Sequence, residues 1–219
     1  MLQARALPEV RAIYKTLIFD VDGTLINTEE AVLGSLQKML QLEYNKSYAR
    51  EDLSFVLGIP GSRSLPQLGI EDIDRANELW NRYMKDFMDT IHVYPGVEET
   101  LHTLASRGVQ LGIVTSKTKE ELKDDFEPFG LMKYLSVVVC ADDTELHKPH
   151  PEPIYKFLEV SRADPSSAIY IGDTVYDSSC ARDSKVAFGL AMWGANPEHN
   201  IEADHYFHNP EEINMYAKP

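Results

Sequence analysis

Short apolar runs alternate with amphipathic stretches along most of the chain. Runs of four or five aliphatic and β-branched residues that end in turn residues predict buried strands. They lie at Thr16–Phe19, Leu111–Val114, Ser136–Val139, Ala168–Ile171 and Val186–Leu190, with a weaker one at His205–Phe207. Helical spacing of apolar residues occurs between them, at Val97–Arg107, Lys119–Phe129, Ile154–Val160 and Tyr176–Ser184. This alternation predicts an α/β fold with a Rossmann-like core and a mostly parallel sheet.

One interval breaks the alternation. From Thr28 to Val93 no strand pattern is present, and helical patterns at Glu29–Leu42 and Ile70–Met88 flank a loop at Gly58–Ser62. A helical insertion directly after the first strand predicts a small second domain over the carboxyl edge of the sheet. We therefore predict an α/β core formed by residues 1–27 and 93–219, and a helical cap formed by residues 28–92. A further helix start is predicted at Asn209–Glu212.

Charge and cysteine content narrow the class of protein. The 219 residues include 21 basic and 35 acidic side chains, a formal net charge of −14, which argues against nucleic acid or anionic membranes as partners. Cys140 and Cys180 are too few for a zinc cluster or a disulfide framework. No apolar run approaches the ~20 residues of a membrane span, and the N-terminal segment lacks the apolar core of a signal peptide. We expect a soluble cytoplasmic protein, either a monomer or a homodimer.

Polar residues follow four of the predicted strands. In chain order they are Asp20 and Asp22, then Thr115, then Lys148, and finally Asp173 with Asp177 four residues later. Gly23 allows the chain to curl after the first strand. Because ligands bind at the carboxyl ends of parallel strands, these side chains are expected to surround one site.

This set of residues suits phosphoryl transfer. Mg²⁺ prefers oxygen ligands and takes few carboxylates, and Asp20 and Asp173 supply two. A carboxylate can attack phosphorus to form an acyl-phosphate, and a second carboxylate can transfer the proton. Lys148 and the cation would neutralise the transferring group, while Thr115 and the backbone amides at Val21, Asp22 and Ser116 would complete a phosphate cradle.

Each motif, taken alone, also has a simpler structural interpretation. Asp-x-Asp-Gly resembles the start of an EF-hand loop or a plain turn. Lys148 has the context of an exposed loop lysine, and Asp173 that of a helix cap. Lys117 and Lys119 follow Thr115 closely and rival Lys148 as the phosphate-binding lysine. The joint order of the motifs along the chain favours the chemical reading.

The motifs resemble those of a known family. Asp20–Leu25, Ile113–Thr115, Lys148–Pro149 and Gly172–Asp177 are similar to the four motifs of the haloacid dehalogenase-like hydrolase superfamily. Tyr94–Val97 resembles the return to the core in members that carry a helical cap. The likeness is nearest to the phosphoglycolate phosphatase-like branch. That branch includes phosphatases of phosphoglycolate, sugar phosphates, nucleotides and pyrophosphate, and also β-phosphoglucomutase.

The resemblance implies a role for each matching residue. Asp20 would be nucleophile and metal ligand, Asp22 the general acid/base with its carbonyl on the metal, and Asp173 a ligand of Mg²⁺. Thr115 and Lys148 would hold the phosphoryl group, Gly23, Thr24 and Ser116 would bind phosphate, and Asp177 would support Lys148 or a metal-bound water. The chain departs from the family at Asn27, which is often Asp there. Asp22 argues against dehalogenation, because dehalogenating members lack this second carboxylate.

The expected function is that of a Mg²⁺-dependent phosphatase. It would hydrolyse a small phosphorylated metabolite through an aspartyl-phosphate. Two alternatives stay open: a phosphomutase of the β-phosphoglucomutase type, and a catalytically idle protein that binds a phosphorylated ligand. In the predicted cap, Arg63 lies in the loop Gly61–Ser64 and either contacts the substrate or is solvated.

Overall fold

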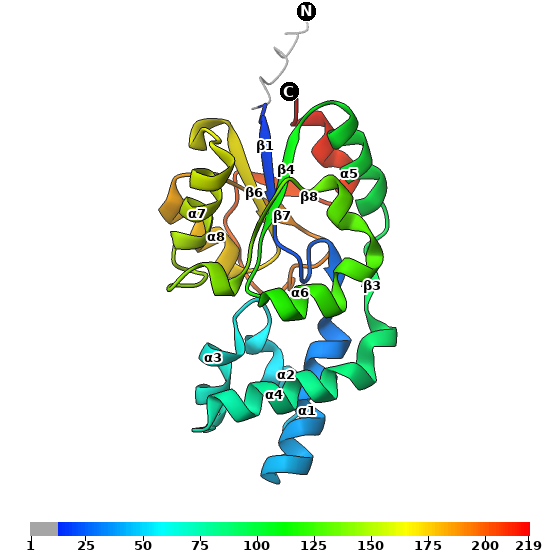
Figure 1. Cartoon of the computed structure of the whole chain (residues 1–219), viewed down its shortest axis with the longest axis vertical. Coiled ribbons are helices and arrows are strands. Elements are labelled where there is room, and N and C mark those ends of the chain that lie inside the picture. The colour runs from blue at the N-terminus through cyan, green and yellow to red at the C-terminus, as the bar shows by residue number, and fades with distance from the viewer. Residues whose placement is uncertain (1–12) are drawn as a thin grey trace, which may run out of the picture.

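Six strands form one parallel sheet in the order β5-β4-β1-β6-β7-β8 (Figure 1). The computed structural model describes residues 13–219, so residues 1–12 of the predicted core, and with them most of the N-terminal segment weighed as a signal peptide, lie outside the described residues. The strands are β1 (Thr16–Phe19), β4 (Gln110–Val114), β5 (Val137–Val139), β6 (Ala168–Gly172), β7 (Ala187–Ala191) and β8 (His205–Phe207). The predicted α/β fold with a parallel sheet is confirmed.

Helices cover both faces of the sheet. On one face α7 (Glu152–Ser161) and α8 (Val175–Ser184) pack over β5, β6 and β7; α5 (Val97–Ser106) and the 3₁₀ helix η8 (Pro210–Met215) lie on the other face (Figure 1). Strand β1 lies between β4 and β6, and all four of its residues are buried. Apolar residues on all sides of a strand are typical of a parallel sheet covered on both faces.

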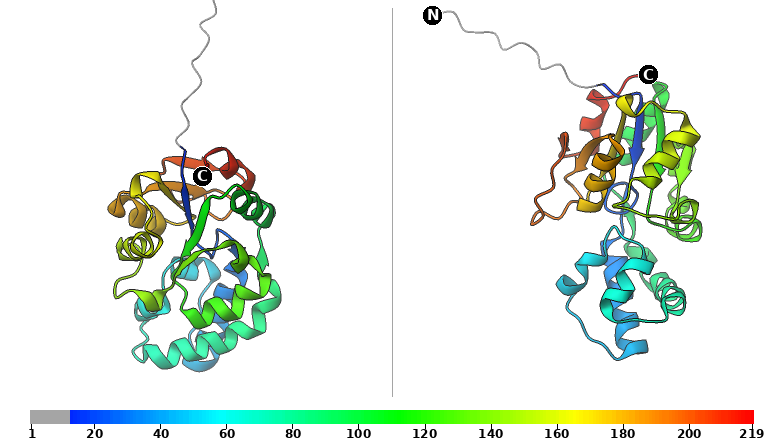
Figure 2. Two further views of the ribbon diagram at one scale, coloured as in Figure 1. Left: turned by 45° about the horizontal axis from the view of Figure 1, so that its top comes forward. Right: turned by 90° about the vertical axis from the view of Figure 1, so that its left-hand side faces the viewer.

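A helical segment lies beyond the carboxyl ends of the strands (Figure 2). Its elements are α1 (Glu29–Tyr44), α2 (Arg50–Leu53), η1 (Ser54–Val56), α3 (Gly61–Ser64), η2 (Leu65–Leu68), α4 (Ile73–Met84) and η3 (Lys85–Thr90). Leu36 and Met39 of α1 pack with Leu79 of α4 in an apolar core separate from those of the sheet. Helical spacing of apolar residues thus produced a small bundle, as the sequence predicts.

A two-stranded antiparallel ribbon joins the helical segment to the sheet. It pairs β2 (Ile26–Asn27) with β3 (His92–Val93). The prediction that no strand lies between Thr28 and Val93 is therefore wrong at His92–Val93. Two residues are too few for a periodic pattern, and the pairing partner is far away in the sequence. The predicted cap boundaries run through this ribbon.

Several helices are shorter than the periodicity predicts. The helix expected at Lys119–Phe129 is α6 (Lys119–Asp125) followed by η4 (Glu127–Phe129), because Pro128 lacks the N–H that an α-helix requires. The helix expected at Ile70–Met88 ends at Met84 and continues as η3. At the tail, the Asn209 side chain accepts from Glu212 N at 3.2 Å as a cap, but the helix is 3₁₀.

Three further 3₁₀ turns complete the fold: η5 (Leu131–Tyr134), η6 (Ala141–Asp143) and η7 (Pro165–Ser167). Cys140 and Cys180 are free and buried. Among residues 13–219, no helix has both the length and the apolar character needed to cross a membrane.

Candidate active site

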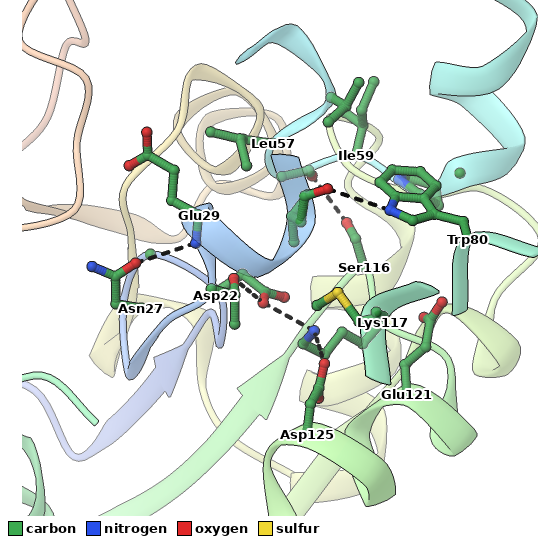
Figure 3. Close-up of a pocket in the computed structure, with 18 of the residues that line it drawn as sticks. Asp22, Asn27, Glu29, Leu57, Ile59, Trp80, Ser116, Lys117, Glu121 and Asp125 are labelled. Carbon is green, nitrogen blue, oxygen red and sulfur yellow. Dashed lines mark hydrogen bonds and ion pairs between the residues drawn. The ribbon is translucent and has the colours of Figure 1, made fainter. Parts of the chain in front are cut away.

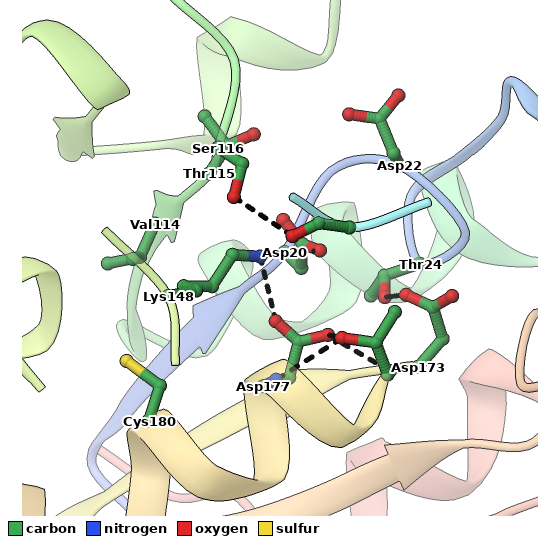
Figure 4. Close-up of polar contacts among 12 residues, drawn as sticks. Asp20, Asp22, Thr24, Val114, Thr115, Ser116, Lys148, Asp173, Asp177 and Cys180 are labelled. Carbon is green, nitrogen blue, oxygen red and sulfur yellow. Dashed lines mark hydrogen bonds and ion pairs between the residues drawn. The ribbon is translucent and has the colours of Figure 1, made fainter. Parts of the chain in front are cut away.

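Asp20 lies at the carboxyl end of β1, in the middle of the sheet, and is 1% exposed. The neighbouring strands β4 and β6 end in Thr115 and Asp173, and Lys148 enters from the loop between β5 and α7 (Figure 4). Parallel strands therefore bring together side chains that are up to 153 positions apart in the sequence. These are the residues that the motifs predicted would meet.

Lys148 is the centre of a buried cluster of charges. Its Nζ lies 2.8 Å from Asp20 Oδ2 and 2.7 Å from Asp177 Oδ1, and it donates to the Tyr170 hydroxyl at 3.2 Å. Tyr170 in turn lies 2.9 Å from Asp177 Oδ1, and Thr174 Oγ1 donates to Asp177 Oδ2 at 2.5 Å. Asp177 is thus saturated with donors, whereas Lys148 is the only partner of the Asp20 carboxylate in the described part of the chain.

Asp173 is held by residues that follow β1. Thr24 Oγ1 donates to Asp173 Oδ1 at 3.1 Å, and both residues are buried. Gly23 has a φ of +73°, and a Cβ at this position would lie 2.1 Å from Asp173 Oδ2. Only glycine fits this close approach. Thr24, expected to bind phosphate, instead uses its hydroxyl on Asp173.

The electrostatics of the cluster show a deficit of positive charge. Burial, helped by Asp177 and Asp22 and opposed by Lys148, raises the pKa of Asp20 to about 7. Burial and the charges of Asp177 and Asp20 raise the pKa of Asp173 well above its ordinary value. Burial also opposes the charged form of Asp177, but Lys148 and the hydrogen bonds from Thr174 and Tyr170 hold its pKa below the usual range.

A hard cation fits this donor set. Asp20, Asp173 and Asp177 each offer a carboxylate oxygen, and these atoms lie within 4.8 Å of one another. Asp177 already accepts from Lys148 and Thr174, so Asp20 and Asp173 have the free lone pairs. Apart from the ion pair with Lys148, neither oxygen of Asp20 has a hydrogen-bond partner in residues 13–219. Oxygen donors with unused capacity and excess negative charge are what Mg²⁺ requires.

A second cluster of charges surrounds Lys117. Lys117 Nζ lies 2.9 Å from Asp22 Oδ1 and 2.7 Å from Asp125 Oδ2 (Figure 3). Burial opposes the charged form of Lys117, but these two carboxylates raise its pKa above the ordinary value. Thr28 Oγ1 also donates to Asp22 Oδ1, at 2.6 Å. Lys117 was a rival for the phosphate-binding role, but its ammonium is occupied by two carboxylates, and it is Lys148 that contacts Asp20.

The other predicted residues have specific contacts. Thr115 Oγ1 accepts from the backbone N–H of Lys117 at 3.2 Å. Ser116 Oγ donates to the Gly58 carbonyl of the helical segment at 3.1 Å. Arg63 is exposed, and its guanidinium donates to the main-chain carbonyl of Lys148 at 3.0 Å. Arg63 is not among the described residues that line the cavity. Its contact is instead with the loop that carries Lys148.

A cavity of about 130 Å³ lies between the helical segment and the sheet (Figure 3). The helical segment lines it with Val56–Gly61, Trp80 and Met84, and the sheet side lines it with Asp22, Ser116 and Asp173. Asn27, where the family often has Asp, also lines it and accepts from Glu29 N at 3.2 Å. The cavity is thus bounded by residues of the predicted site on the sheet side and by the helical segment on the other side, as is typical of a binding pocket.

The fold and the site together indicate a hydrolase with an α/β core and a cluster of carboxylates at the carboxyl ends of its strands. Residues 17–191 match the model of the haloacid dehalogenase-like hydrolase family. The chain belongs to the haloacid dehalogenase-like hydrolase family, as the motifs predicted, and it is a hydrolase of the phosphatase class. The confirmed prediction rests on four short motifs and their order.

Individual relatives agree with this assignment. The pyrophosphatase PpaX of Halalkalibacterium halodurans is 30% identical over 202 residues, which cover 90% of this chain and 94% of that protein. A Lactobacillus plantarum protein, provisionally named a phosphoglycolate phosphatase, has a TM-score of 0.86 at 31% identity and covers 93% of this chain and 99% of its own. CbbY of Rhodobacter sphaeroides, solved with phosphate, has the same fold, with a TM-score of 0.80 at 17% identity over 92% of this chain and 96% of its own.

Sequence reasoning missed two residues of the site. Asp125 is the last residue of α6 and has no motif around it, and Tyr170 lies within a strand of otherwise apolar residues. Asp125 has a buried Oδ1 without a hydrogen-bond partner among the described residues, and burial raises its pKa to about 6. An acidic residue on a helix face that otherwise packs against the protein was the only available signal.

Proposed function

We propose that this protein is a Mg²⁺-dependent phosphatase that hydrolyses a small phosphorylated metabolite through an aspartyl-phosphate on Asp20. The observation that carries the proposal is the state of Asp20. It is a buried carboxylate at the carboxyl end of the central strand, and Lys148 is its only polar partner in the described chain. A carboxylate kept free of hydrogen bonds in the interior is costly unless its oxygens act on a ligand.

The reaction runs in two displacements. An Asp20 oxygen attacks phosphorus, a new P–O bond forms, and the bond to the leaving oxygen breaks as that oxygen takes a proton. Water then attacks the aspartyl-phosphate, gives up a proton and releases phosphate. Lys148 offsets negative charge on the transferring group, and Asp177 keeps Lys148 in place with a second ion pair. Asp20 and Asp173 would hold Mg²⁺, which supplies positive charge at the phosphoryl oxygens.

Asp22 is suited to move both protons. It follows Asp20 by two residues, lines the cavity and keeps an exposed side-chain fraction of 23%, whereas Asp20 is nearly inaccessible. The same carboxyl group would protonate the leaving oxygen and then deprotonate water. Proton transfer of this kind contributes about 10²–10⁴-fold to a rate.

The cavity favours a leaving group without a second negative charge. Within the described residues, Lys117 is the only basic side chain that lines it, and Asp22 and Asp125 neutralise that lysine. Glu29 and Glu121 add further negative charge to the lining. This favours a sugar phosphate over phosphoglycolate or pyrophosphate, although relatives bear those names.

The test is phosphate release from p-nitrophenyl phosphate with Mg²⁺, with excess chelator, and with the Asp20→Asn variant. Turnover that disappears under both changes supports the proposal. Metal-independent turnover, or turnover by Asp20→Asn, contradicts it. No turnover at all would favour the catalytically idle alternative.

The substrate class is tested with a panel of glucose phosphates, phosphoglycolate, nucleoside monophosphates and pyrophosphate. We expect the highest kcat/KM among the uncharged, hydroxylated leaving groups. On glucose 1-phosphate, an isomer formed faster than phosphate would identify a mutase instead.

A further inference from the structure

The Asp22 carboxylate is anchored through one oxygen only. Lys117 Nζ and Thr28 Oγ1 both contact Asp22 Oδ1, at 2.9 and 2.6 Å. Within residues 13–219, Asp22 Oδ2 has no hydrogen bond or ion pair. Figure 4 shows the Asp22 carboxylate pointing away from Asp20 and Asp173. One oxygen is thus held by two donors, and the other is left for a ligand in the cavity.

A second carboxylate, that of Asp125, holds the Lys117 ammonium on the side away from Asp22. Asp125 Oδ2 takes the other side of the ammonium at 2.7 Å, and both residues are buried. Lys117 immediately precedes Thr118, which caps α6 in a reciprocal pair of hydrogen bonds with Glu121, and Asp125 ends the same helix. The short helix α6 therefore sets the distance between the lysine and its second carboxylate.

The contacts of Lys117 argue against a role in binding the phosphoryl group. A lysine has three donors, and two of them already face the carboxylates of Asp22 and Asp125. A buried ion pair costs desolvation energy and contributes little net stability, so its retention indicates a positional role. Among residues 13–219, Asp125 Oδ1 is buried without a hydrogen-bond partner, a further cost that the ion pair with Lys117 helps to offset.

We propose that Lys117 is a positioning residue for Asp22. With Thr28 it anchors Oδ1, so that Oδ2 is presented to the leaving oxygen and later to water, and Asp125 holds the lysine in place. This inference rests on the proposed function, in which Asp22 transfers the protons. Lys117 lines the cavity, but two carboxylates contact its ammonium. Its effect on the rate passes entirely through Asp22.

The test compares two leaving groups in a single turnover, with acid quenching and mass analysis of the protein. Lys117→Met removes the charge at similar length. Because p-nitrophenolate leaves without a proton, its release should change less than threefold. An alkyl phosphate needs the proton, and its cleavage should slow about 10²-fold, the cost typical of a misplaced group. Lys117→Arg keeps the charge and should recover part of that loss.

A double-variant cycle separates positioning from general damage. In an Asp22→Asn background, Lys117→Met should cost nothing further with the alkyl phosphate, because the group it positions is already gone. Thr28→Val removes the other donor to Oδ1 and should slow the same substrate selectively. It also serves as the second variant should Lys117→Met fail to fold.

Two results would overturn the inference while leaving the phosphatase proposal intact. One is equal slowing of both leaving groups by Lys117→Met or Thr28→Val. The other is additive losses in the double variant. Wild-type protein that releases no phosphate, or an active Asp20→Asn variant, would overturn the proposed function itself and this inference with it.

Discussion

Two clusters of the same composition lie on either side of the first motif. Each has a lysine between two aspartates: Asp20–Lys148–Asp177 in one, and Asp22–Lys117–Asp125 in the other. The first is sealed, with side-chain exposures of 0–2%. The second opens on the cavity, since the Asp22 side chain is 23% exposed.

The difference lies in what completes each cluster. Tyr170 and Thr174 add donors to Asp177, so the Asp177 carboxylate is fully hydrogen-bonded. In the Lys148 cluster, the oxygens with unused lone pairs are therefore those of Asp20. Around Lys117, the accessible oxygen without a partner among residues 13–219 is Asp22 Oδ2, whereas the unpaired Asp125 Oδ1 is buried. The same two residue types thus surround the proposed nucleophile, which is buried, in one place and the proposed proton carrier, which is accessible, in the other. Burial and accessory hydrogen bonds decide the role.

The largest expected effect is at the nucleophile. Asp20→Asn should reduce turnover at least about 10⁴-fold with every substrate, since an amide cannot form an acyl-phosphate. The measurement is steady-state phosphate release across the substrate panel, with circular dichroism to show that the variant folds. Near-normal turnover by the folded variant would show that Asp20 is not the nucleophile. The proposed difference in role between the two clusters would then be lost.

Stability should separate the two lysines next. Lys148→Met leaves two buried carboxylates unpaired and should lower the free energy of unfolding by about 3–5 kcal/mol. Lys117→Met should cost less, because water still reaches Asp22. Urea unfolding of the two variants, matched in the substitution made, gives the comparison. A larger loss of unfolding free energy for Lys117→Met than for Lys148→Met would contradict the view that the Lys148 cluster is the more deeply buried of the two.

Metal affinity should distinguish the two aspartates that follow β6. Asp173→Asn removes a carboxylate with free lone pairs and should raise the Mg²⁺ concentration for half-maximal activity by more than the ~10–100-fold typical of a residue that only supports a ligand. Asp177→Asn should change it less, because Asp177 faces Lys148 rather than the free oxygens. Identical Mg²⁺ titration curves for Asp173→Asn and wild type would exclude Asp173 from the metal site.

The pH dependence of stability should reflect the buried carboxylates. Without Mg²⁺, the pKa of Asp20 is raised to about 7, above the ~3.9 of an unfolded aspartate, so the folded protein keeps a proton that the unfolded chain loses. This contribution is fully present below about pH 4 and is lost as pH rises through 7. The metal-free Tm should fall by roughly 2–4 °C per kcal/mol lost.

Adding Mg²⁺ provides the control for that pH series. Because protons compete with the metal at Asp20, Mg²⁺ should raise Tm more at pH 8 than at pH 6. Thermal melts with and without the metal at both pH values measure the difference. An equal rise at both would show that Asp20 does not bind the ion.

The smallest expected effect is at Arg63. Its guanidinium donates to the Lys148 carbonyl from an exposed position, so Arg63→Ala should slow all substrates alike, by about tenfold or less. The kcat/KM ratios between substrates are the readout. A selective loss on one substrate class would instead give Arg63 the substrate contact that its place in the helical segment suggested.

Local patterns in the sequence determined the strands, most helices and the order of the reacting residues. A buried strand needs a continuous apolar run, and a carboxylate directly after the run marks the end of the strand. Asp20 and Asp173 could therefore be predicted from the sequence alone. The helical insertion could also be predicted, because its apolar residues repeat at helical spacing. The β2–β3 ribbon could not, because two residues carry no period.

Only the tertiary structure decided what each polar side chain touches. Lys117 and Lys148 read alike as loop lysines, and their different partners depend on packing between α6, α8 and the ends of β1 and β4. Thr24 looked like part of a phosphate cradle, yet its hydroxyl donates to Asp173, and the only local signal for Asp125 was its place on a packed helix face. Hydrogen bonds and ion pairs act over about 3 Å between residues distant in sequence, so no pattern along the chain encodes them.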